Sequence, residues 1–136
     1  MRKTIAALTI STAALLTAYG LDHLTVILRK TMFRSFSSTP LLSIGAFNLA
    51  FAALLVLMLL AIKKQTDNSK AAALTCIGIG LLANASMWLY FNLRIFPSGM
   101  MEFLSPNSHL SMTGSLIAAL GAISLVQSAR QNKIVS

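Results

Sequence analysis

Long apolar stretches fill most of the chain, and polar residues gather in the short segments between them. The apolar stretches are residues 4–28, 41–62, 71–93 and 109–127. A run of about 18 or more apolar residues with few charges is long enough to cross a membrane as a helix. Residues 54–62 are apolar throughout, without the alternation of a membrane β-strand. The pattern predicts an all-α integral membrane protein, a four-transmembrane-helix up-down bundle that forms a single domain over residues 1–136.

The composition agrees with this class of protein and limits the kinds of partner that we expect. The chain has 136 residues, of which 56% are hydrophobic and 10% charged, whereas a soluble domain carries about 25% charged residues. The net charge of +8 comes from Lys and Arg at the ends of the apolar stretches. Such residues bind anionic lipid headgroups, so we predict the lipid bilayer and no nucleic acid as a partner. The single Cys76 excludes an intramolecular disulfide and is expected to be a buried thiol.

The N-terminus has features of a secretory signal peptide. A basic start, an apolar run over 5–16 and small residues over 18–20 are the three parts of such a signal. However, the apolar run resumes at Leu24 and continues to Leu28. We therefore predict an uncleaved first helix.

Basic residues are distributed unequally between the two sides of the predicted bundle. The two chain ends and the 63–70 connection hold seven Lys and Arg, and the 29–40 and 94–108 connections hold four. By the positive-inside rule, both termini are expected to be cytoplasmic, in a bacterial inner (plasma) membrane. The other two connections, which are longer and amphipathic, then lie on the outer side.

Polar residues in the apolar stretches share helical faces toward the outer side. Spacings of three and four residues place each polar residue on one helical face together with its neighbours. The four groups are Tyr19, Asp22 and His23; Asn48, Phe51 and Ala52; Gly80, Asn84 and Trp88; and His109, Thr113 and Leu116. Ionisable residues in membrane segments usually face the bundle interior or water and are functional candidates. If these groups face the interior of the bundle, they line a cavity in its outer half. The candidate ligand-binding residues are Tyr19, Asp22, His23, Asn48, Asn84, Trp88, Arg94, His109 and Thr113.

The same residues have structural interpretations. Asp22 and His23 would be hydrated if they lay at the interface. Asn48 and Asn84 would hold neighbouring helices together, a contribution of about 0.6–2 kcal/mol for each polar contact. His109 would simply be a surface residue at the start of a helix.

The last stretch carries two further local signals. Ser108 precedes it and is expected to be a helix N-cap. Gly114, Ala118 and Ala122 are four residues apart and give the helix a face of small residues. Small residues let helices approach closely in lipid, either within one bundle or between membrane chains.

The predicted function is that of a non-catalytic membrane module. It would bind a lipid-like or small ligand in the outer-half polar cavity, or serve as a small subunit of a larger membrane complex or a homo-oligomer. No nucleophile–base pair and no metal-ligand spacing is present in the sequence, so we assign no catalytic or metal-binding residue, and the cofactor is unknown.

Other functions stay open. A membrane enzyme or transporter for an amphipathic substrate would use Asp22 or His23 as acid or base, with Arg94 as an anion contact. A redox subunit would bind haem b through His23 and His109. Its obstacle is that the first and last helices of an up-down bundle are expected to be neighbours rather than diagonal partners. A pore-forming lysis protein suits the size but lacks a continuous polar stripe.

Overall fold

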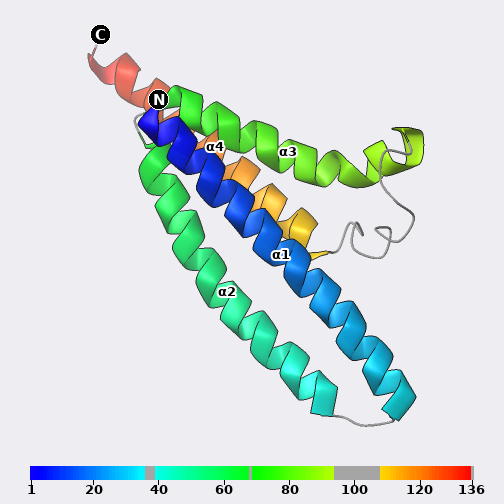
Figure 1. Ribbon diagram of the computed structural model, residues 1–136. Helices are drawn as coiled ribbons and strands as arrows, with labels where there is room; N and C mark the ends of the chain where they lie inside the picture. Colours follow the sequence, from blue (N-terminus) through cyan, green and yellow to red (C-terminus); the bar gives the residue numbers. More distant parts are fainter. Residues whose placement is uncertain (36–38, 68, 94–107, 136) are drawn as a thin grey trace.

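Four antiparallel helices make up the protein in the computed structural model, which describes residues 1–35, 39–67, 69–93 and 108–135 (Figure 1). The helices are α1 (Arg2–Ser35), α2 (Thr39–Thr66), α3 (Lys70–Leu93) and α4 (His109–Val135). They run up and down, so that the N- and C-termini lie at the same end (Figure 1). The predicted all-α four-helix bundle is confirmed.

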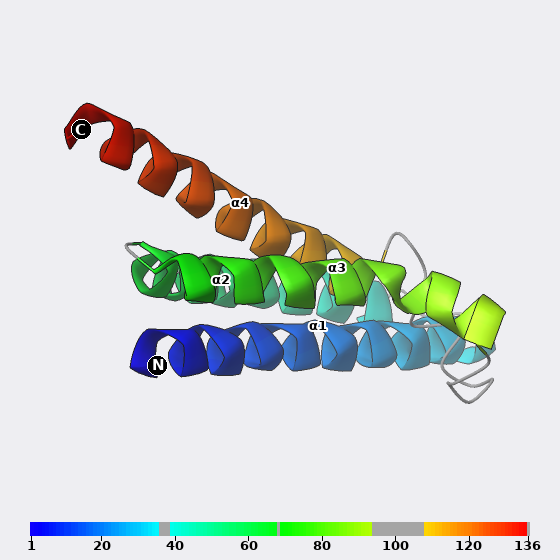
Figure 2. The same cartoon turned by 90° about the horizontal axis from the view of Figure 1, so that it is seen from above.

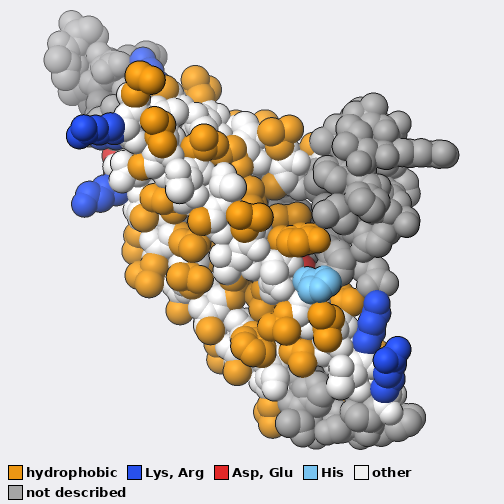
Figure 3. All heavy atoms as spheres, viewed as in Figure 1, with side chains coloured by type: hydrophobic (Ala, Val, Ile, Leu, Met, Phe, Trp, Pro, Cys, Tyr) orange, Lys and Arg blue, Asp and Glu red, His pale blue; other side chains and the backbone are white. Residues whose placement is uncertain are grey.

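The surface of the bundle is that of a membrane protein. Three helical segments are long and apolar enough to cross a membrane, namely Arg2–Arg34, Leu42–Thr66 and His109–Arg130, and Lys70–Ala85 is a shorter apolar helix. Large apolar side chains are exposed along these helices, for example Leu42 and Leu49. Figure 3 shows hydrophobic side chains over the length of the described surface and Lys and Arg toward its two ends. Lipid, rather than water, is the solvent that suits such a surface.

The helices extend beyond the apolar stretches that predicted them. α1 continues to Ser35 instead of ending at residue 28, and α4 continues to Val135 instead of residue 127. Polar residues end an apolar run but do not end a helix, and no Gly or Pro lies between residues 21 and 39. As a result, Asp22 and His23 lie about 18–20 Å before the end of α1, well inside the helix.

The order of the helices around the bundle differs from the expected one. The most extensive packing is between α3 and α4 and between α1 and α2, whereas α2 and α3 barely touch. Figure 2 shows α1 and α4 on opposite sides, with α2 and α3 between them. The expectation that the first and last helices are neighbours in the ring is therefore wrong, because α3 packs against both α1 and α4. α1 and α4 meet across the short diagonal of the bundle.

Small residues set the close approach of α3 and α4. A Cβ atom on Gly80 would collide with the carbonyl oxygen of Gly114, and one on Gly121 would lie 2.6 Å from the carbonyl oxygen of Ala73. The predicted small-residue face of α4 therefore packs within this bundle. Nothing lies within 4 Å of a Cβ atom built on Gly78, which is two residues, or about half a turn of α3, from Gly80.

α1 packs through a narrow seam of small side chains. Alternating steps of four and three residues separate the buried positions, as in a coiled coil. These positions are Ala7, Ser11, Ala14, Ala18, Leu21 and Thr25. Ser11 Oγ lies 3.7 Å from the sulfur of the buried Cys76 on α3. The predicted burial of the single thiol is confirmed.

Candidate ligand-binding site

The site starts at the N-terminus of α4, where the backbone N–H groups of residues 109–111 have side-chain partners. The Ser108 hydroxyl accepts a hydrogen bond from the Ser111 N–H at 3.2 Å, and the Ser108 carbonyl accepts one from Met112 at 3.1 Å. The predicted N-cap is confirmed. The Met112 bond is the first regular bond of the helix, so among the N–H groups that a helix leaves unpaired at its start, those of His109 and Leu110 still need partners.

Asp22 supplies the missing acceptors from a different helix. Its Oδ1 accepts a hydrogen bond from the His109 N–H and its Oδ2 accepts one from Leu110, both at 3.0 Å. The carboxylate is only 8% exposed. A negative charge is stabilised at this position because the helix dipole is positive at its N-terminus. Asp22 therefore fixes the start of α4 against the middle of α1.

The same carboxylate holds the imidazole of His109. Nδ1 of His109 lies 2.6 Å from Asp22 Oδ1. An ionised carboxylate only accepts hydrogen bonds, so Nδ1 donates, and in the neutral imidazole Nε2 is then an acceptor. The ring also packs edge-on against Phe51 of α2, with 5.6 Å between ring centroids and 84° between the planes. Contacts from α1 and α2 thus fix the orientation of one ring on α4.

A cavity of about 260 Å³ lies next to this histidine, between α2 and α4. Its walls combine two of the helical faces that the sequence spacing defined. They are Asn48, Phe51, Ala52 and Leu55 of α2, with His109, Met112, Thr113 and Leu116 of α4. The walls are apolar except for Asn48, His109 and Thr113.

Two polar atoms in these walls are buried without a hydrogen-bond partner among the described residues. They are Asn48 Oδ1 and Thr113 Oγ1. Leaving a buried polar group unpaired costs about 1–3 kcal/mol, which is why such groups are rare. Both atoms are closed off from the open part of the pocket, so a molecule there reaches them only when neighbouring side chains move aside, and hydrogen bonds to both would then remove this cost.

The hydroxyl of Thr113 differs from other threonine hydroxyls in the helices. Thr9, Thr17 and Thr75 each donate a hydrogen bond to the carbonyl four residues earlier, at 2.8–2.9 Å. This is the usual way to satisfy a threonine in an apolar helix. Thr113 is fully buried and makes no such bond within the described part of the chain.

Asn84 lies on the opposite side of α4 and has a different environment. Its Oδ1 accepts hydrogen bonds from Ser111 at 2.8 Å and from Ser115 at 3.1 Å, and its Nδ2 donates to the Gly80 carbonyl at 2.9 Å. Asn84 therefore connects α3 to α4, which is the structural interpretation of this residue. It does not line the cavity.

The remaining predicted residues are not walls of the cavity as the structure describes it. Tyr19 and His23 lie on α1. Trp88 lies on α3, but its side chain and the whole of Arg94 lie outside the described residues. A binding role for these four residues stays a prediction.

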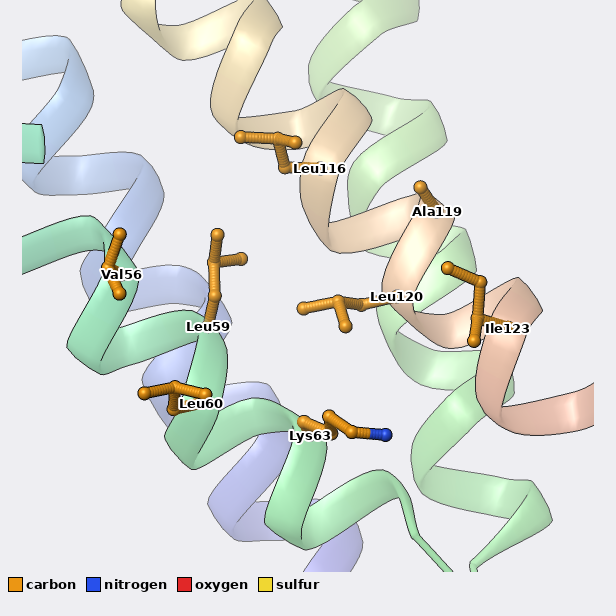
Figure 4. Close-up of a pocket in the computed structure, with 8 residues that line it drawn as sticks. All are labelled: Val56, Leu59, Leu60, Lys63, Leu116, Ala119, Leu120 and Ile123. Atoms are coloured by element: carbon orange, nitrogen blue, oxygen red, sulfur yellow. The ribbon is translucent and has the colours of Figure 1, made fainter. Parts of the chain in front are cut away.

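An apolar groove lies between the same two helices, nearer the chain termini (Figure 4). It also has a volume of about 260 Å³. Side chains of α2 and α4 face each other across it, and Leu116 belongs both to this groove and to the polar cavity. The walls are Val56, Leu59, Leu60, Lys63, Leu116, Ala119, Leu120 and Ile123.

The fold and the site define an all-α protein with membrane-type helices and a partly polar, open pocket between α2 and α4. No known protein family, curated protein or solved structure matches the chain. Among the described residues, no group of three His, Cys, Asp or Glu side chains is placed to hold a metal ion. The function must therefore be argued from the site.

Proposed function

We propose that the protein binds a small or lipid-like ligand in the cavity between α2 and α4, and that it does so as a non-catalytic membrane module. The observation that carries the proposal is that Asn48 Oδ1 and Thr113 Oγ1, both buried and unpaired among the described residues, line one cavity. One partner in the pocket, either a ligand or a water molecule held there, could satisfy both atoms.

The position of the cavity in the bundle supports access from the outer half of the membrane. Basic residues mark the end of the bundle with the two termini, which we assign to the cytoplasmic side of a bacterial inner membrane. A span of about 20 residues from that side, counted from Thr4 along α1, ends near Asp22. His109, which contacts Asp22, then lies at the outer boundary of the hydrocarbon, and Asn48 and Thr113 lie a few ångströms below it.

The hydrogen bonds indicate different roles for Asp22 and for the three polar wall residues. The Asp22 carboxylate already accepts three hydrogen bonds from α4. We therefore assign it a positioning role, in which it holds the ring of His109 in the cavity wall. His109, Asn48 and Thr113 are the side chains that contact the ligand.

Mass spectrometry of molecules that copurify with the full chain tests the proposal. The wild-type protein is extracted in a mild detergent and compared with Asn48→Leu and Thr113→Val. Both variants are expected to retain less of a specific molecule, because each removes a polar contact. Thr75→Val is the matched control, since its hydroxyl bonds to its own helix, and it should retain the wild-type amount. Equal retention by all four proteins, or nothing but water in the cavity, would contradict the proposal.

The Asp22–His109 pair also supports a second candidate, an enzyme or transporter for an amphipathic substrate. A carboxylate that orients an imidazole leaves the second ring nitrogen available to take a proton, as general bases do. In this candidate, His109 rather than His23 is the base. Catalytic turnover or transport that is lost in His109→Gln, while ligand binding survives, would favour this function over simple binding.

A further inference from the structure

Two contacts between α2 and α4 mark the ends of a region in which pockets lie between these helices. On the outer side, Phe51 packs against His109. Near the termini, the hydroxyls of Thr66 and Ser124 form a buried hydrogen bond of 2.9 Å. The polar cavity and the apolar groove lie between these two contacts and share Leu116. They lie end to end along α2 and α4 and meet at Leu116, and we call the two together the slot, which has a polar end and an apolar body.

The shape of the slot restricts its occupant. From His109 to Ser124 it is about 22 Å long, at 1.5 Å for each helical residue. A helix from another chain, about 10–12 Å across, would have to separate α2 from α4 and break the contacts at both ends. A single acyl chain is slender enough to lie between the helices without breaking them.

The chemistry of the polar end restricts the head group. A hydroxyl can both donate and accept hydrogen bonds, as can the Asn48 amide and the Thr113 hydroxyl, and it can also donate to His109 Nε2. An anionic head group would lie beside the Asp22 carboxylate with no Lys or Arg among the described residues of the polar end, which is unfavourable. Among the described residues, Lys63 is the only Lys or Arg in the walls of the slot, and it lies at the far end, paired with Asp67 at 3.5 Å.

We infer that the slot binds a neutral lipid with a hydroxyl head group. The head lies among Asn48, Thr113 and His109, and one acyl chain follows the groove past Leu120 toward the aliphatic stem of Lys63. The Lys63 ammonium then reaches the aqueous surface, as lysines near membrane boundaries do. This inference rests on the proposed function and names the chemical class of its ligand.

Binding of three probes to the purified full chain in phosphatidylcholine nanodiscs tests the inference. The probes are monooleoylglycerol, oleic acid and monobutyrylglycerol, and bound probe is counted by native mass spectrometry. Monooleoylglycerol has the predicted head and chain, oleic acid has the chain with a carboxylate head, and monobutyrylglycerol has the head with a short chain. We expect monooleoylglycerol to bind at least about tenfold more tightly than ionised oleic acid, equivalent to ~1.4 kcal/mol.

Two variants that fill the groove test the position of the acyl chain. Leu120→Trp and Leu60→Trp enlarge a wall residue from α4 and from α2, respectively. Each is expected to weaken binding of monooleoylglycerol by about tenfold, because overpacking of a filled site is costly. Binding of monobutyrylglycerol should not change. The matched control is Val126→Trp, which enlarges an exposed residue of α4 outside the groove.

The outcomes separate this inference from the proposed function. If oleic acid binds as well as monooleoylglycerol, or if both groove variants bind the long probe like wild type, the neutral-lipid inference is wrong while Thr113-dependent binding still supports the site. If no probe binds and Thr113→Val retains the same copurified molecules as wild type, the proposed function fails as well. Two groove variants on different helices guard against the misfolding of one, and circular dichroism checks the helix content of each.

Discussion

The two faces of α4 show how one helix can pack tightly on one side and leave space on the other. Toward α3, glycines bring the backbones together and Asn84 has hydrogen bonds to both serines that reach it. Toward α2, larger side chains hold the helices apart, and Asn48 and Thr113 have buried polar atoms without partners among the described residues. Polar residues therefore have opposite roles on the two faces: they stabilise the closed interface and destabilise the open one until a ligand is present.

The largest effect is expected from breaking the closed interface at Gly80. Gly80→Val places a side chain against the backbone of Gly114, where no flexible atom can move aside. We expect the free energy of unfolding in detergent to fall by about 3 kcal/mol, the upper part of the range for overpacking. Gly78→Val is the matched control, since the space around Gly78 is open. Similar losses in both variants would show that helix propensity, rather than close packing, controls the interface.

Removing the Asp22 carboxylate is expected to have the next largest effect. Asp22→Ala leaves two N–H groups at the start of α4 without an acceptor and removes a charge that the helix dipole stabilises. We expect a loss of about 2 kcal/mol in the free energy of unfolding. Asp67→Ala, which removes an exposed ion pair, should cost less than about 1 kcal/mol. A loss no greater than that of Asp67→Ala would mean that Asp22 does not fix α4.

Asn84→Leu tests the polar contacts of the closed interface. The substitution removes the acceptor of the Ser111 and Ser115 hydroxyls. Polar contacts between membrane helices contribute about 0.6–2 kcal/mol, so the unfolding free energy should fall by about 1 kcal/mol. Equal stability of wild type and variant, measured by the same unfolding titration, would contradict the role of Asn84 as a connection between α3 and α4.

Thr113→Val should have the smallest effect on stability, and the sign should be reversed. The variant replaces an unpaired buried hydroxyl with a methyl group of similar size. In protein stripped of bound lipid, we expect the unfolding free energy to stay the same or to rise by about 1 kcal/mol. A clear loss of stability would show that the hydroxyl has a partner in the protein, and would remove the main reason for placing a ligand there.

Much of the fold follows from the sequence, because local patterns determine it. Apolar stretches defined the four helices, and Ser108 marked the start of α4 through a contact only three residues away. The helical spacing also grouped the residues of α2 and α4 that line the cavity. These features depend on neighbours within one helix, whose geometry is the same in every protein.

The features that could not be predicted from the sequence depend on contacts between segments that are far apart in the chain. Asp22 caps a helix that begins 87 positions later, and no local pattern connects the two. The helix order around the bundle is set by which small-residue faces meet, and several helices carry such faces. Asn48 and Asn84 have the same chemistry and similar depth, so only their neighbours distinguish an unpaired amide from one that connects two helices.

The stabilisation produced by a ligand tests the central claim most directly. The free energy of unfolding is measured with and without saturating monooleoylglycerol for wild type and for Thr113→Val. At a concentration of about 100 times Kd, a ligand that binds only the folded state adds about 2.7 kcal/mol, and wild type should gain this amount. Thr113→Val should gain much less, although it is at least as stable without ligand. The same gain in both proteins, or no gain in either, would contradict a ligand site between α2 and α4.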